Sequence, residues 1–255
     1  MLPTLSYPDS LHHISIWRAF EASVGRNPNK VAISSPNLLL TYGEIDQLTR
    51  QPFLSDLLDH HALEVLQFLR LLCSAYHNNQ IIDENAILYD QSKCLTERSL
   101  GLSILNIAVC HPILSRDTVS AVPVNLEKPM NMIVSIAPLF LGGTVCFVDG
   151  TNISTMIAKI SEGSVNQAWL GEHEYNQWLP KKIPDPSPQF RGLICIGLPR
   201  SIICNQLIEW AGPEKVQAVA LDQDSLPWAR YLNMSPQYDP YPGFILVDEK
   251  IPHES

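Results

Sequence analysis

The stretch MNMIVSIAPLFLGGTVCFV at residues 130–148 contains the pattern that decides the fold. Residues 130–141 are almost entirely apolar and are predicted to form a helix, although Pro138 lies inside it. A pair of glycines ends this helix, and residues 144–148 follow directly as a short apolar strand. A buried helix joined to a buried strand by a tight turn is the repeating unit of an α/β fold.

The same rhythm continues on both sides of this stretch. Residues 118–124 are predicted to form a strand before it, and helices and strands alternate after it. Such alternation indicates parallel pairing through right-handed crossovers, and continuous apolar strands indicate a sheet covered on both faces. The sequence therefore predicts an α/β fold. In this half we expect helices at residues 154–160, 171–179 and 201–210, and strands at residues 165–170, 193–196 and 216–221.

The first part of the chain contains the same kinds of element in a different order. Two short strands separated by a turn are predicted to form a hairpin. Thr41, with Glu44 three residues later, forms a capping box that starts the next helix. We expect helices at residues 13–24, from residue 41 onward and at residues 61–77, and strands at residues 31–34, 38–40 and 86–89.

Composition excludes several classes of function. A chain of 255 residues is expected to form one large domain or two joined subdomains, and its net charge of -9 argues against nucleic-acid binding. The six cysteines include no C-x-x-C pair, which indicates buried thiols in a reducing compartment. With no basic-then-apolar leader and no stretch long enough to span a bilayer, we expect a cytoplasmic protein without membrane contact. The adjacent histidines at residues 12–13 and 60–61 would point in different directions from a helix, so we expect no metal site.

Five segments, taken in order, resemble those of the adenylate-forming enzymes, a superfamily of acyl-CoA synthetases, luciferases and adenylation domains of nonribosomal peptide synthetases. LTYGEI follows the strand VAI as it does at the start of these enzymes. IAPLFLGGTV and FRGLICIG are similar to the family's apolar helix and to the strand that comes next. PGFILVDE resembles the strand that opens its barrel subdomain. These segments lie at residues 31–33, 40–45, 136–145, 190–197 and 242–249.

The resemblance implies a specific architecture. It implies two mostly parallel sheets with helices on both faces, as in the N-terminal subdomains of the family. Residues 1–110 and 111–221 are then two α/β halves, and residues 222–255 are a remnant of the barrel subdomain. The family's C-terminal lid, with its catalytic lysine, is expected to be absent.

The segments that handle ATP in the family have no clear counterpart in this sequence. The family surrounds the triphosphate with the loop T-S-G-T-T-G-x-P-K-G after a strand, because backbone N–H groups and hydroxyls bind phosphate. Here the corresponding stretch, DQSKCLTERS, has no glycine; its polar candidates are Asp90, Ser92, Lys93 and Thr96. The family's Y-G-x-T-E element corresponds to VALDQD, in which Asp224 lies near the expected carboxylate. Adenylation is therefore expected to be lost.

Candidate ligand-binding residues follow two of the predicted strands. His173 and Glu174 come directly after residues 165–170, in a region that helps to line the acyl or amino-acid pocket in the family. Gly197 and Arg200 lie in the next strand-to-helix turn, where a helix N-terminus attracts anions. Each of these residues is equally compatible with a simple helix start or connecting turn.

Three functions remain open at this point. The first is a pseudoenzyme that binds an acyl, aryl or aminoacyl group, or the carrier protein or enzyme bearing it, in a nonribosomal peptide or polyketide pathway. The second is an ATP-independent enzyme in which His173 and Glu174 perform acid–base catalysis. The third is a structural subunit of a biosynthetic complex. We expect no cofactor, and we expect a protein partner or self-association.

Overall fold

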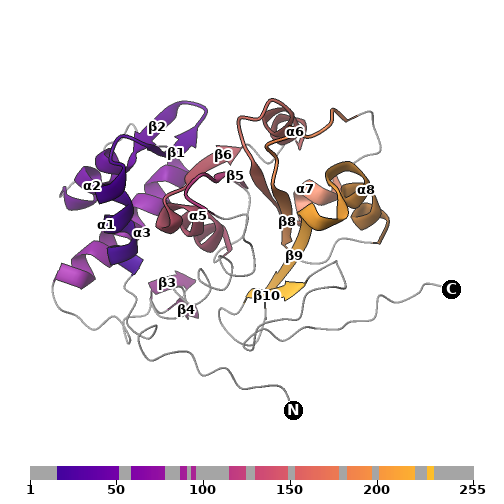
Figure 1. Ribbon diagram of the computed structural model, residues 1–255. Helices are drawn as coiled ribbons and strands as arrows, with labels where there is room; N and C mark the ends of the chain where they lie inside the picture. The colour runs from indigo at the N-terminus through magenta and orange to yellow at the C-terminus, as the bar shows by residue number, and fades with distance from the viewer. Residues whose placement is uncertain are drawn as a thin grey trace, which may run out of the picture.

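A computed structural model describes ten segments of the chain (Figure 1). They are residues 16–51, 59–77, 87–90, 93–95, 115–124, 130–148, 153–177, 183–196, 201–221 and 229–232.

The centre of the molecule is an eight-stranded sheet in the order β10-β9-β8-β7-β5-β6-β1-β2. Its six inner strands are parallel, whereas β2 and β10 pair antiparallel with β1 and β9 at the two edges. A separate two-stranded antiparallel sheet is formed by β3 and β4. The strands are β1 (Val31–Ser35), β2 (Leu38–Thr41), β3 (Ile87–Asp90), β4 (Lys93–Leu95), β5 (Val119–Pro123), β6 (Thr144–Val148), β7 (Gln167–Leu170), β8 (Gly192–Ile196), β9 (Val216–Leu221) and β10 (Ala229–Leu232).

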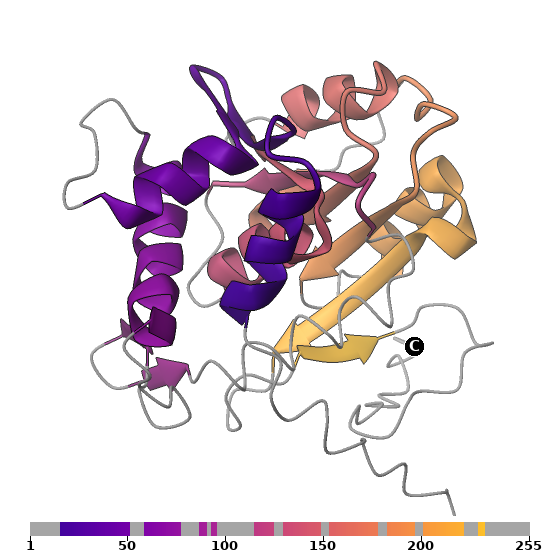
Figure 2. The same ribbon diagram turned by 60° about the vertical axis from the view of Figure 1, so that its left-hand side comes forward.

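Helices cover both faces of the large sheet, as Figures 1 and 2 show from two directions. Helices α1, α2, α3 and α5 pack together on one face, and α6, α7 and α8 lie on the other. Among the described residues, no helix combines the length and apolarity that crossing a membrane requires. The helices are α1 (Ile16–Arg26), α2 (Tyr42–Arg50), α3 (His60–His77), α5 (Met130–Leu141), α6 (Ile153–Ser161), α7 (Glu172–Asn176), α8 (Ser201–Ala211) and the 3₁₀ turn η2 (Pro213–Lys215).

The inner strands are mostly apolar because successive side chains enter two different cores. In β6, Phe147 belongs to the first core cluster, beneath α1, α2, α3 and α5, whereas its neighbour Cys146 belongs to the second core cluster, beneath α6, α7 and α8. In β7, Trp169 likewise enters the first cluster and Ala168 the second. This two-residue alternation favours apolar residues on both faces, so the strands show no solvent-exposed polar face in the sequence.

Polar contacts join α1, α2 and the loop before β1 to the end of α5. The buried Tyr42 hydroxyl donates toward the carbonyl oxygens of Leu139 and Gly143, at 3.0 and 2.6 Å. The Ser23 hydroxyl donates to the Phe140 carbonyl at 3.2 Å, and the Lys30 ammonium donates to the Gly142 carbonyl at 2.7 Å. These donors add to the backbone hydrogen bonds at the end of α5 and connect α1, α2 and the loop before β1 to the turn between α5 and β6.

The predicted α/β class is confirmed, and so are the helix at residues 130–141 and the strand at 144–148. The element predicted at residues 171–179 is shorter, because α7 covers only Glu172–Asn176 among the described residues. The large sheet combines strands from the early and the later parts of the chain. Strand β1, from the first half, pairs with β6 of the second, so the large sheet contains strands of both. The division of the chain near residue 110 stays a prediction.

Candidate functional site

The sheet has a topological switch point between β5 and β7. The chain passes from β5 to β6 through α5 on one face, and from β7 to β8 through α7 on the opposite face and in the opposite direction along the sheet. In open α/β sheets, ligands bind beyond the carboxyl ends of the strands at this type of position. The residues that follow β5 and β7 are therefore the candidate site.

The structure describes the whole turn from the end of β7 into α7. Strand β7 ends at Leu170, and Gly171 is the extended N-cap residue of α7. The neighbouring strand β5 ends at Pro123, after which the Val124 amide donates to the Val148 carbonyl of β6 at 3.1 Å. The first residues of α7 are thus held at the carboxyl edge of the sheet, next to the switch point.

Glu174 is buried at this edge, with 1% of its surface exposed. Its Oε2 atom accepts a hydrogen bond from the Gly171 backbone N–H at 2.8 Å, which caps α7. Its Oε1 atom is buried and has no hydrogen-bond partner among the described residues. Leaving a buried acceptor unpaired costs about 1–3 kcal/mol, so this oxygen is a candidate for a contact to a ligand donor.

His173 has a different environment from its neighbour. It is exposed, and its Nε2 atom lies 2.6 Å from the Gln177 amide nitrogen, one helical turn later. This contact joins His173 to Gln177 at the C-terminal end of its own helix. The described contacts therefore join His173 to Gln177 and Glu174 to Gly171, and they do not bring the predicted acid–base pair together.

Of the residues predicted for the phosphate loop, the structure describes Asp90 and Lys93, which lie on two paired strands. Asp90 ends β3 and faces Lys93 of β4 in the antiparallel register. Only residues 91 and 92 connect the two strands. The other predicted candidates, Gly197, Arg200, Asp224, Ser92 and Thr96, lie outside the described residues.

A buried polar group beneath the switch point was not anticipated from the sequence. The Trp169 indole N–H donates to the Ser120 hydroxyl at 3.0 Å, and this hydroxyl donates in turn to Gln167 Oε1. Gln167 is fully buried, and its Nε2 atom has no partner in the part of the chain that the structure describes. The only signal in the sequence is a glutamine within an apolar strand, and pairing of Ser120 with Gln167 depends on the register of β5 and β7.

The paired histidines at the start of α3 contact an aromatic ring and a carboxylate among the described residues. His61 packs against Phe147 with ring centroids 5.7 Å apart, and His60 lies 3.8 Å from Glu64. Within the part of the chain that the structure describes, no group of three or more potential ligands is arranged to hold a metal ion.

Comparisons with known proteins identify the fold. No protein-family model matches the sequence, and a comparison with curated proteins gave no match. The structure, in contrast, is similar to many solved structures. A long-chain-fatty-acid–CoA ligase from Archaeoglobus fulgidus aligns with a TM-score of 0.64 at 11% identity, over 91% of this chain and 68% of that one.

Two further structures illustrate the range of these similarities. The N-terminal subdomain of NpsA from Klebsiella oxytoca, solved with 3-hydroxybenzoyl-AMSN, aligns with a TM-score of 0.58 at 10% identity, over 93% of this chain and 80% of that one. A fatty acyl-adenylate ligase from L. pneumophila, solved with acyl adenylate and pyrophosphate, aligns with a TM-score of 0.57 at 10% identity, over 85% of this chain and 56% of that one. Identities this low establish the fold alone. The chain therefore has the fold of the N-terminal subdomains of adenylate-forming enzymes.

Proposed function

We propose that this chain binds an acyl, aryl or aminoacyl group at the carboxyl edge of its sheet and does not activate that group with ATP. The proposal combines two features of the molecule. The scaffold is that of enzymes that form adenylates, and the segment that would hold the triphosphate is reduced.

The β3–β4 hairpin is the observation that carries the proposal. In the resemblance described above, a glycine-rich loop follows the strand at this place and surrounds the phosphates. Here β3 and β4 pair up to Asp90 and Lys93, and only two residues, Gln91 and Ser92, connect them. A connection of this length offers too few backbone N–H groups to enclose a triphosphate, and neither of its residues is glycine.

The carboxyl edge of the sheet has features that support the binding of a ligand there. The switch point is present, and Glu174 presents an unpaired oxygen beside it. Neighbouring folds were solved with 3-hydroxybenzoyl and acyl-adenylate ligands. We propose that a related carboxylic acid or its carrier-linked form occupies this edge, and that the chain acts with a carrier protein or a partner enzyme in a secondary-metabolite pathway.

Calorimetry with magnesium and ATP tests the loss of activation. We expect no heat of binding, and no exchange of labelled pyrophosphate into ATP with any carboxylic acid supplied. Magnesium-dependent binding of ATP, or exchange with even one acid, would show that adenylation persists and would overturn this part of the proposal.

A matched pair of substitutions tests the ligand position. Glu172 is exposed at the carboxyl edge, and Glu209 is exposed near the end of α8, at the opposite edge. Binding is measured by calorimetry with 3-hydroxybenzoate, a long-chain fatty acid and L-aspartate as probes. We expect Glu172→Trp to abolish binding of whichever probe binds, because the new ring fills the edge. Equal loss in Glu209→Trp, or binding of none of these probes, would contradict the proposed site.

A further inference from the structure

A thiol, an amine and a hydroxyl from three different elements meet at the margin of the second core cluster. Cys146 of β6 and Ser34 of β1 are direct neighbours in the parallel register of these two strands. Lys159 lies in the last turn of α6, next to Ile160, which belongs to the same cluster as Cys146. Hydrogen bonds join the Cys146 thiol to the Ser34 hydroxyl and to the Lys159 ammonium. We call Cys146 and Lys159 the thiol–amine pair.

The thiol–amine pair lies where the second core cluster ends. Cys146 is 5% exposed, and Lys159 and Ser34 are half-buried. Beyond Ser34, the next cross-strand neighbour is Leu39 of β2, which is 64% exposed. Among the described residues, no member of the second cluster comes from β1 or β2. A small solute can therefore approach the Cys146 sulfur from the side of β1, whereas a bulky reagent meets a sulfur that is almost covered.

The charge of Lys159 acts directly on the thiol. Burial raises the pKa of the Cys146 thiol, and the Lys159 ammonium opposes that shift, together with the hydrogen bonds to Ser34 and Lys159. The cation thus favours the thiolate, which is the form that reacts with oxidants. Because burial is the larger of the two effects, we expect Cys146 to react slowly, and only with a small and strong oxidant.

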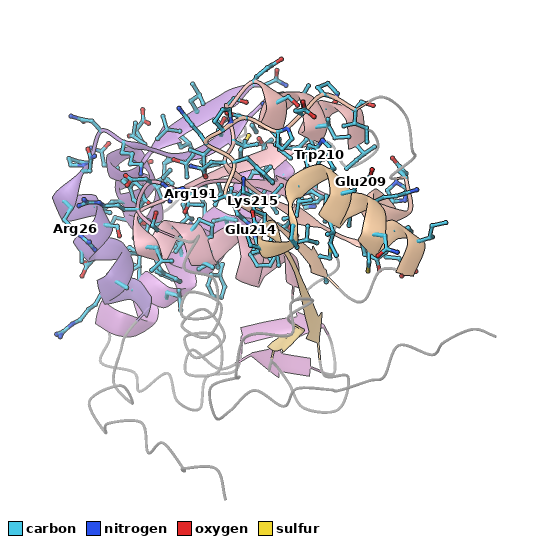
Figure 3. All side chains as sticks on the ribbon, turned by 45° about the vertical axis from the view of Figure 1, so that its right-hand side comes forward. Arg26, Arg191, Glu209, Trp210, Glu214 and Lys215 are labelled. Atoms are coloured by element: carbon cyan, nitrogen blue, oxygen red, sulfur yellow. The ribbon has the colours of Figure 1, made fainter. Side chains whose placement is uncertain are left out.

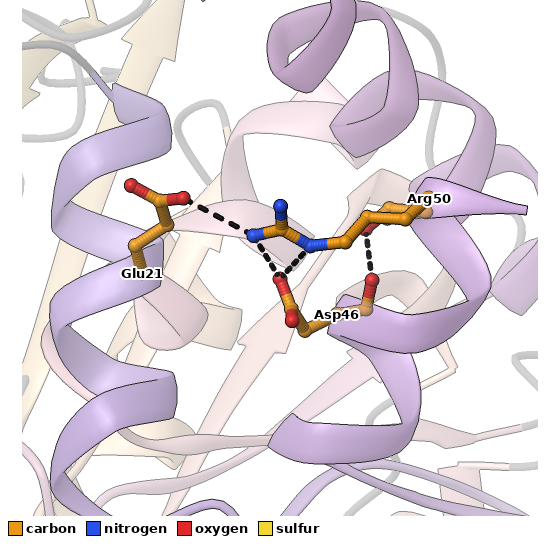
Figure 4. Close-up of polar contacts among 4 residues, drawn as sticks. Glu21, Asp46 and Arg50 are labelled. Atoms are coloured by element: carbon orange, nitrogen blue, oxygen red, sulfur yellow. Dashed lines mark hydrogen bonds and ion pairs between the residues drawn. The ribbon is translucent and has the colours of Figure 1, made fainter. Parts of the chain in front are cut away.

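Cys73 of α3 provides a comparison within the same chain. It is buried to a similar degree, with 6% of its surface exposed, and it also lies near a cation, Arg50. The Arg50 guanidinium, however, lies 2.8 Å from Asp46 and 3.2 Å from Glu21 (Figure 4). These two carboxylates also raise the pKa of Cys73. A guanidinium stays protonated and offers no amine lone pair to sulfur, so Cys73 has the burial of Cys146 without its reactive partner.

We propose that the thiol–amine pair is an oxidative modification site, at which hydrogen peroxide joins Cys146 to Lys159 through a reversible sulfur–nitrogen bond. In the first step, the thiolate sulfur attacks one oxygen of the peroxide and the O–O bond breaks. The sulfur is oxidised to a sulfenic acid, and the second oxygen is reduced and leaves as water. In the second step, the Lys159 amine, after losing a proton to water, attacks this sulfur. The S–O bond breaks, a second water leaves, and the S–N bond forms.

The contact between the two side chains decides which product forms. A sulfenic acid condenses with a nearby thiol or nitrogen, and a group held in contact reacts far faster than one in solution. The interactions described for Cys146 include no second thiol, so the Lys159 amine is its nearest partner. The bond would tie α6 to β6, and two molecules of a thiol reductant would reverse it while becoming a disulfide. This proposal is independent of the proposed function, because neither residue belongs to the candidate ligand site.

Peptide mapping by tandem mass spectrometry, after hydrogen peroxide treatment of the full chain, tests the modification site. We expect a peptide pair joined at Cys146 and Lys159, lighter by two hydrogen atoms than the separate peptides and released by dithiothreitol. Cys146→Ser and Lys159→Arg are both expected to abolish it, and the second keeps the positive charge. The control Lys215→Arg makes the same change in η2, beside Glu214 (Figure 3), and is expected to keep the crosslink. Circular dichroism establishes that the variants are folded.

Three outcomes would overturn the proposal. One is oxidation of Cys146 to a sulfinic or sulfonic acid while Lys159 stays unmodified, which would show that the amine does not capture the sulfenic acid. Another is a disulfide between Cys146 and a second cysteine as the main product. The last is a crosslink of Cys146 that persists in Lys159→Arg, which would assign it to a different nitrogen. A crosslink that is lost in Lys159→Arg and kept in Lys215→Arg supports the proposal.

Discussion

At the scale of single residues, Tyr42 connects the first helices of the chain to the end of α5. Its hydroxyl is buried and lies within hydrogen-bond distance of two carbonyl oxygens, and burial raises its pKa. Tyr42→Phe removes the donor from both carbonyl groups. We expect the free energy of unfolding to fall by about 1–3 kcal/mol in urea titrations.

Tyr175→Phe is the matched control for this substitution. Tyr175 is also buried, but the described contacts include no hydrogen bond of its hydroxyl. We expect this variant to change the free energy of unfolding by less than about 0.5 kcal/mol. Equal losses in the two variants would show that the α5 carbonyl groups do not depend on Tyr42.

His61 predicts a pH dependence of stability. Burial lowers its pKa first, and the neighbouring His60 adds to this shift, while Glu64 and Asp59 oppose it. The unfolded chain therefore binds a proton at His61 more readily than the folded chain. The contribution of His61 to stability is complete above the unfolded-state value of about 6.5 and is lost as the pH falls below it.

The measurement is the free energy of unfolding as a function of pH. We expect it to fall with pH below about 6.5 in the unchanged protein. His61→Phe keeps an aromatic ring against Phe147 and removes the titrating group, so its curve is flatter in this range. His60→Phe, at the exposed neighbour, keeps most of the slope. An unchanged slope in His61→Phe would assign the pH dependence to other groups.

At the scale of elements, the turn between α5 and β6 requires glycine at residue 143, because no space remains there for a side chain. A side chain at Gly143 would place its Cβ 2.9 Å from the Thr118 carbonyl oxygen and 3.2 Å from that of Pro138. These are backbone atoms, so they cannot move aside without shifting β5 or α5. We expect Gly143→Ala to lower the free energy of unfolding by about 1–3 kcal/mol in chemical denaturation.

Gly25→Ala makes the same substitution at a different site, and we expect it to raise the free energy of unfolding where Gly143→Ala lowers it. Gly25 lies in α1, and a Cβ there meets no atom within 4 Å. Alanine is the better helix former, so this variant is expected to gain up to about 1 kcal/mol. A loss in Gly25→Ala, or no loss in Gly143→Ala, would contradict the description of these two sites.

At the scale of the whole molecule, the two core clusters share the strands of one sheet. Leu66 of α3 belongs to the first cluster and Leu207 of α8 to the second, and both are fully buried. We expect Leu66→Ala and Leu207→Ala each to cost about 2–5 kcal/mol. Because β5, β6, β7 and β8 contribute to both clusters, each variant is expected to shift one common transition.

Thermal unfolding followed by tryptophan fluorescence and by far-ultraviolet circular dichroism checks this expectation. The tryptophans report on both sides, since Trp17 lies in the first cluster and Trp210 packs on Phe190 of the second. Two separate transitions, each moved by only one of the substitutions, would show that the two sides of the sheet unfold independently.

The sequence by itself determined the class of fold and the position of several elements. The glycine pair that ends the helix at residues 130–141, and the capping box of Thr41 and Glu44, are local signals, and the structure confirms both. The order of motifs also identified the superfamily whose fold the chain has. These features follow from backbone chemistry within a few residues, so no distant contact is needed to predict them.

Only the tertiary structure decided how the elements combine and what the candidate residues contact. The pairing of β1 with β6 and the polar group around Ser120 and Gln167 both depend on strands far apart in the sequence. The sequence placed His173 and Glu174 side by side. The structure gives them different surroundings, because adjacent residues of a helix point in different directions and only one of them enters the core.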